Sequence, residues 1–131
     1  MSIQTLGAGS VATADLRSAM TTAGALPTAP HFLVRASHSR SITLVTLTLD
    51  FVSLLPQPVS APSGWIAVPI NQPLSVGEAL LWTVVANAAV PKMGAFLALN
   101  GKLKYLKHKN NLAAGVAWSP NPVVLRSSHL S

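Results

Sequence analysis

The sequence predicts an all-β protein, an antiparallel β-sandwich in which helices are confined to one or two short loop segments. Residues 41–51 alternate apolar with hydroxyl-bearing or acidic side chains, the period of a half-buried strand. Asn100 and Gly101 separate two apolar runs, the strongest short signal for a hairpin. Ten Pro and eight Gly oppose a bundle of long helices. The sequence predicts seven or eight short strands at intervals of roughly ten residues, which is typical of a β-sandwich.

The composition predicts one folded domain that spans residues 1–131. The chain has 131 residues, of which 50% are hydrophobic and 9% are charged. So much apolar content with so little charge is unlike an intrinsically disordered chain. Neither an internal repeat nor a linker divides the sequence, so we expect a single β-sandwich domain.

The amino-terminal region is predicted to contain an extended segment followed by a helix. Residues 1–12 are small and polar, and we expect an extended arm or a short strand. A short helix is predicted over residues 14–23, capped by Thr13 or Asp15 and ended by Pro27. The apolar side chains that share one face of this helix are Leu16, Ala19, Met20 and Ala23.

The alternation over residues 41–51 changes phase once. Apolar residues occupy even positions at Ile42 and Leu44, and odd positions from Leu47 through Phe51. Such a slip at Val45 and Thr46 indicates a β-bulge, or a stretch that is buried on both faces.

Prolines separate the next elements. Three prolines within residues 56–62 predict a loop, because they are excluded from central strands. A strand is predicted over residues 64–68, ended by Pro69. Ser75 and Glu78 have the spacing of a capping box, which predicts a short helix.

The second half of the chain is predicted to form strands only. The hairpin at Asn100 and Gly101 connects a strand that ends at Leu99 to a returning strand. The strands expected here cover residues 80–85, 95–99, 102–108, 116–118 and 123–126. We expect Trp65, Trp82 and Trp118 to pack in the core or in an interface.

The hydrophobic content does not predict a membrane span. Residues 79–98 form the longest apolar-rich stretch, but Asn87, Pro91 and Lys92 interrupt it. The first residues lack the basic start and apolar run of a secretory signal. We therefore expect the apolar surface to be buried in the fold or between subunits, in an obligate oligomer.

The residue inventory favours binding or assembly over catalysis. The chain has no Cys and three acidic residues, so it lacks thiolate zinc sites and has little for paired-carboxylate chemistry. The four histidines match no zinc spacing, and no nucleophile elbow or glycine-rich phosphate loop is present. We expect no enzyme activity, no cofactor, no metal and no small-molecule substrate.

Two basic groups are candidates for binding a polyanion, in keeping with a formal net charge of +6. Residues 102–109 hold four lysines beside Tyr105, a combination suited to phosphate contacts and base stacking. In a regular strand, Lys102, Lys104, Leu106 and His108 share one face, and Leu103, Tyr105, Lys107 and Lys109 share the other. The candidate nucleic-acid-binding residues are Lys102, Lys104, Tyr105, Lys107, His108, Lys109, Arg35, His38 and Arg40. The alternative is a solvated hairpin whose lysines protect an edge strand, with surface histidines that have no role.

Residues 32–79 resemble the coat proteins of tymoviruses and their relatives, small icosahedral viruses. The matching parts are an aromatic and basic segment at 32–37, the alternating strand at 41–49, a proline-rich connection at 56–62, a strand that ends in residues 68–73, and a helix that begins at Ser75. The family has a Trp where Ala67 stands and a small residue in place of Ile70, and residues after Ala79 have no match.

The resemblance implies a jelly-roll subunit that assembles with copies of itself into a shell around single-stranded RNA. Coat proteins of this group place basic residues and histidines on the inner surface. We therefore expect a virion protein, made in the cytoplasm of the host cell. Two alternatives remain open: a small non-viral nucleic-acid-binding β domain that uses residues 102–109, and an accessory protein whose residues 79–98 contact lipid.

Overall fold

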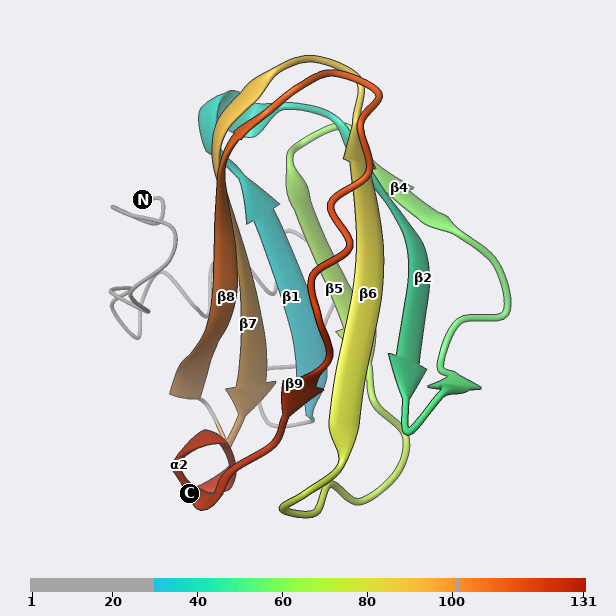
Figure 1. Ribbon diagram of the computed structural model, residues 1–131, viewed down its shortest axis with the longest axis vertical. Helices are drawn as coiled ribbons and strands as arrows, with labels where there is room; N and C mark the ends of the chain where they lie inside the picture. Colours follow the sequence, from blue (N-terminus) through green and yellow to red (C-terminus); the bar gives the residue numbers. More distant parts are fainter. Residues whose placement is uncertain (1–29, 101) are drawn as a thin grey trace.

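The chain folds into two antiparallel β-sheets packed face to face, which confirms the predicted β-sandwich (Figure 1). The structure is a computed structural model that describes residues 30–131 apart from Gly101. The arm expected over residues 1–12 and the helix expected over residues 14–23 lie outside the described residues.

Sheet A has four strands in the order β5-β1-β7-β8, and sheet B has the order β3-β2-β6-β9, with β4 also paired to β2. Sheet A consists of β1 (His31–Ala36), β5 (Trp65–Pro69), β7 (Val90–Leu99) and β8 (Lys102–Leu112). Sheet B consists of β2 (Ile42–Leu49), β3 (Val52–Ser53), β4 (Val59–Ala61), β6 (Ala79–Ala86) and β9 (Val123–Val124). The helical segments between residues 30 and 131 are the short 3₁₀ turn η1 (Ser37–Ser39) and the helix α2 (Ser127–Leu130).

The predicted irregularity in β2 is a β-bulge. The pairing of β2 with β6 shifts register between Leu44 and Thr46. Leu44 and Leu47 are both buried, whereas Val45 and Thr46 are both exposed. The bulge therefore keeps the apolar side chains on the core side, and the alternative of a stretch buried on both faces is wrong.

The strand β2 ends before Phe51, contrary to the predicted alternation. Asp50 and Phe51 both have positive φ, 49° and 66°, and form the tight turn into β3. The Asp50 carboxylate accepts a hydrogen bond of 2.8 Å from the backbone N–H of Ala79. Phe51 is consequently 76% exposed at this end of sheet B.

The core between the sheets is built around Trp82, which is fully buried. Its ring lies 4.9 Å from that of Phe32 in sheet A and 5.7 Å from that of Trp118, as measured between centroids. Such aromatic pairs stabilise by about 0.5–1.5 kcal/mol beyond their buried area. The prediction for Trp82 and Trp118 is confirmed, whereas Trp65 is partly buried on the opposite face of sheet A.

A turn replaces the helix predicted after Ser75. The Glu78 carboxylate does accept the backbone N–H of Ser75, as in a capping box. Gly77, however, has a φ of 94°, and its N–H donates to the carbonyl of Leu125 at 2.8 Å. Leu125 in turn donates to the carbonyl of Glu78 at 2.8 Å. The positive φ at Gly77 and these bonds end the turn before it can continue as a helix, so the chain enters β6 directly.

The hairpin predicted between Leu99 and Lys102 is confirmed, because these two residues pair and Asn100 has a φ of 52°. Its first strand, β7, begins at Val90, five positions earlier than the predicted residues 95–99. Pro91 is tolerated because the pairing of β7 with β1 stops at Met93, so Pro91 lies beyond the end of β1.

The last predicted strands are shorter than expected. Trp118 makes an isolated bridge to Val84 instead of belonging to a strand, and β9 has two residues. The proline-rich loop contains the short strand β4, and α2 near the carboxyl end was not predicted.

Candidate nucleic-acid interface

The basic strand β8 lies at the edge of sheet A and contains a β-bulge of its own. Phe96 pairs with Tyr105, but the preceding residue Ala95 pairs with Lys107, so Leu106 is an extra residue in β8. Leu106 packs in the core between the sheets. The inserted residue reverses the alternation of side chains along the rest of the strand.

Because of this bulge, all four lysines of β8 lie on one face, which we call the lysine stripe. Lys104, Lys107 and Lys109 pair with Leu97, Ala95 and Met93, whose side chains face the core. Lys102 precedes Lys104 by two residues and shares its face. The predicted distribution, with Lys107 and Lys109 opposite Lys102 and Lys104, is therefore wrong.

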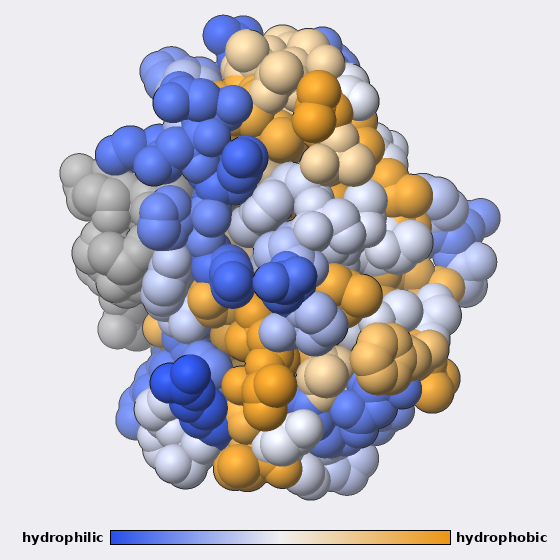
Figure 2. Space-filling view, viewed as in Figure 1, coloured by the Kyte–Doolittle hydropathy of each residue, from blue (hydrophilic) through white to orange (hydrophobic). Residues whose placement is uncertain are grey.

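The lysine stripe follows the open edge of the sandwich. Lys102, Lys107 and Lys109 are exposed, and Lys104 is partly buried. Long lysine stems can cover the margin of a core while their ammonium groups remain in water. The stripe runs alongside β7 from Leu99 to Met93, six residue rises, which is a span of about 20 Å. Figure 2 shows hydrophilic side chains gathered along the left side of the molecule, where Figure 1 places β8.

Tyr105 and His108 lie together on the other face of β8, also because of the bulge. The Tyr105 hydroxyl and His108 Nδ1 share a hydrogen bond. The Tyr105 ring packs against Phe96 at 6.2 Å between centroids. Partial burial raises the pKa of the Tyr105 hydroxyl by desolvation.

Arg35 is brought to this same outer face of sheet A. Its guanidinium carbon lies 5.2 Å above the ring of Trp65, a cation–π contact. Arg35 pairs with Gly94, and Gly94 pairs with His108 on the next strand. Burial lowers the pKa of Arg35 by desolvation. Arg35 therefore belongs with Tyr105 and His108, on the face opposite the lysine stripe.

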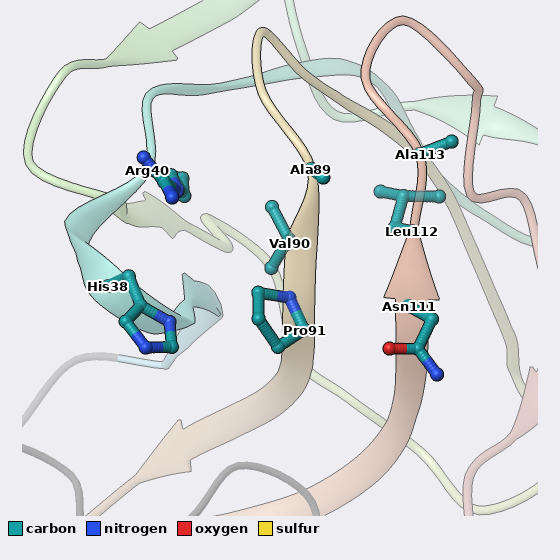
Figure 3. Close-up of a pocket in the computed structure, with 8 residues that line it drawn as sticks. All are labelled: His38, Arg40, Ala89, Val90, Pro91, Asn111, Leu112 and Ala113. Carbon is teal, nitrogen blue, oxygen red and sulfur yellow. The ribbon is translucent and has the colours of Figure 1, made fainter.

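His38 and Arg40 lie at one end of the sandwich, in and just after η1, which follows β1 directly. Both line a pocket of about 440 Å³ together with the start of β7 and the end of β8 (Figure 3). The close-up shows Val90 and Pro91 between His38 and Asn111. The predicted group of Arg35, His38 and Arg40 is thus divided between two places.

Charge is distributed unequally between the two sheets. Besides the lysine stripe, sheet A carries Arg35 and Lys92. The strands of sheet B contain no charged residue. Within the described residues no lysine or arginine forms an ion pair, and the carboxylates of Asp50 and Glu78 bind backbone N–H groups in turns. The positive charge of sheet A is therefore not neutralised within the described fold.

Two basic residues that the sequence analysis missed lie near the lysine stripe. Arg126 and His129 line a second pocket of about 440 Å³, together with Lys107. They occur three residues apart near the carboxyl end, a spacing that puts side chains on one side of a helical turn. The distance from β8 in sequence hid their connection to it.

The described part of the chain contains no group of three His, Asp or Glu side chains arranged to hold a metal. Among its helices, none has the length and apolar character needed to cross a membrane.

Comparisons with known proteins found no matching family model, no matching curated protein and no matching solved structure.

Proposed function

We propose that this chain is a structural protein of a viral shell, which assembles with copies of itself and encloses single-stranded RNA. The observation that carries this proposal is the separation of charge between the sheets. One edge of sheet A presents the lysine stripe, and the strands of sheet B present no charge. A subunit of a shell around RNA needs both a cationic surface and a surface that tolerates contact with a neighbouring copy.

The lysine stripe supports binding to a polynucleotide backbone. Lysines spaced about 7 Å apart on one face of a strand present a row of cations without base-specific donors. The absence of carboxylate partners among the described residues leaves these charges for an external anion. Such contacts are independent of sequence and depend on salt, as expected for a packaged RNA.

The outer face of sheet B supports contact between copies. Here Thr43 pairs with Val85, and Thr46 pairs with Thr83, all directed away from the core. Large apolar side chains are exposed at one end of the sheet: Phe51, Val52, Val76 and Val124. Exposed apolar groups of this kind mark interaction surfaces. Contact through sheet B also keeps the lysine stripes of two copies from facing each other.

The viral assignment is supported by the resemblance of residues 32–79 to tymovirus-like coat proteins. Jelly-roll capsid subunits are themselves sandwiches of antiparallel sheets, the architecture of this chain. On this proposal the protein acts in the virion and in the cytoplasm of the host cell, and it binds and builds without catalysing a reaction.

Light scattering and negative-stain microscopy of the purified chain, with and without single-stranded RNA, test the proposal. We expect megadalton particles that contain RNA. A small species that binds RNA identifies the protein as a nucleic-acid-binding β domain instead. A monomer at high concentration with RNA present contradicts the proposal, as does a requirement for detergent, which indicates lipid contact.

A further inference from the structure

The pocket between β8 and the carboxyl-terminal segment has the properties of a binding site for an anion. Lys107 of β8 lines it from one side, and Arg126 and His129 line it from the segment that follows β9. Leu106, Pro122 and Val123 supply apolar lining. In Figure 1, this segment leads from β9 to α2, which lies below the first residues of β8. Residues more than fifteen positions apart in sequence thus meet at one cavity.

Among the described residues, every charged side chain that lines this pocket is positive. Lys107 and Arg126 make no ion pair with any described residue, and neither Asp50 nor Glu78 lines the pocket. The pKa of His129 is lowered most by desolvation, then by the charge of Arg126 and then by the charge of Lys104. Lys104 therefore lies close enough to add its positive charge to this pocket. Apolar lining reduces the local screening of these charges, so an anion that enters is attracted more strongly than at an open surface.

The orientation of His129 adds a hydrogen-bond donor. Its Nδ1 accepts the backbone N–H of Arg126 at 3.0 Å. A neutral imidazole that accepts at Nδ1 carries its proton on Nε2. Nε2 has no hydrogen-bond partner among the described residues, so its N–H is available to an oxygen acceptor.

We propose that this pocket binds a phosphate group of single-stranded nucleic acid, held by Lys107, Arg126 and the Nε2–H of His129. The proposal rests on the proposed packaging of RNA, which the adjoining lysine stripe supports. Arginine suits this role because its planar guanidinium can donate two parallel hydrogen bonds to phosphate oxygens. The pocket then holds one phosphate at a defined place, and the lysine stripe attracts the neighbouring phosphates of the nucleic acid.

The test uses the full chain, with inorganic phosphate, a ten-nucleotide oligouridylate and phosphatidylserine vesicles as probes. The ring resonances of His129, followed by NMR, report on the pocket directly. We expect phosphate and the oligonucleotide to shift them saturably. Arg126→Ala should weaken phosphate binding about tenfold, since a charged hydrogen-bonding partner is lost. Arg126 is exposed, so the fold should persist, which the NMR spectrum shows.

Lys92→Ala is the matched control, because it removes one exposed cation that does not line this pocket. It should leave phosphate binding within about twofold of the unmodified chain. If the oligonucleotide binds without shifting the His129 resonances, or binds Arg126→Ala as tightly as the unmodified chain, the proposed phosphate site is wrong. The proposed shell is not affected by either result. If the chain binds the vesicles in preference to the oligonucleotide, the pocket binds a lipid headgroup and the proposed site for nucleic acid is wrong. Phosphate binding by a chain that never forms particles supports the pocket and refutes the shell.

Discussion

At the scale of single residues, His129 makes the stability of the fold depend on pH. Partial burial, Arg126 and Lys104 all lower the pKa of His129 below its ordinary value of 6.5. The unfolded chain therefore takes up this proton more readily than the folded chain, so the free energy of unfolding decreases as the pH falls below about 6.5. Urea unfolding at about pH 7.5 and about pH 5.5 measures the effect. His129→Gln should lose less stability over this interval than the unmodified chain.

His38→Gln is the control for this measurement, because His38 is exposed in η1 and lies at the opposite end of the sandwich. It should retain the pH dependence of the unmodified chain. If His129→Gln and the unmodified chain lose equal stability on acidification, the environment inferred for His129 is wrong. Tyr105 and Lys107 also line the pocket beside His129, and burial raises the pKa of the Tyr105 hydroxyl further above this interval.

At the scale of elements, the bulge in β8 determines which lysines act together. Lys104 and Lys107 lie on one face because Leu106 is an extra residue in the strand. Replacing both with Ala should reduce the slope of log K against log salt for single-stranded RNA by about 1.4, since each lost phosphate contact removes about 0.7. Filter binding at several salt concentrations measures this slope.

Lys92→Ala provides the comparison, because it removes an exposed lysine that lies on the other face of sheet A. The neighbouring residue Met93 faces the core, so the side chain of Lys92 is directed to the outer face. It should change the slope by less than about half a unit. An unchanged slope in the double variant, or a larger change in Lys92→Ala, would show that RNA does not bind along the lysine stripe.

The two bulges also show what local sequence can and cannot predict. In β2 the apolar side chains move from even to odd positions at Val45, so the bulge could be predicted from the sequence. In β8 the lysines also change phase, from even positions at 102 and 104 to odd positions at 107 and 109, but the prediction of a regular strand left this change out and put the two pairs on opposite faces. The β8 lysines were therefore predicted as candidates, but their common face was not. The pocket at Arg126, by contrast, could not be predicted locally, because tertiary packing alone brings Arg126 to β8.

At the scale of the whole molecule, the charge-free outer face of sheet B should control assembly. A net charge of +6 makes copies repel, so contact is favoured where no lysine or arginine is present. Thr83 lies on this face, paired with Thr46, and its hydroxyl donates to that of Ser119 at 3.2 Å. A carboxylate here would be buried without a partner in any contact between two such faces, which costs several kcal/mol per ion.

Thr83→Glu should therefore reduce the assembled species to small oligomers or monomers in light scattering, while RNA binding through the lysine stripe persists. Gln57→Glu carries the same change in net charge in the exposed loop before β4 and should assemble like the unmodified chain. Both variants add one negative charge, so a difference in assembly between them is due to the position of that charge. Particles of unchanged size in Thr83→Glu would exclude sheet B from the contact between copies, and the edge of sheet A would then have to supply both contacts.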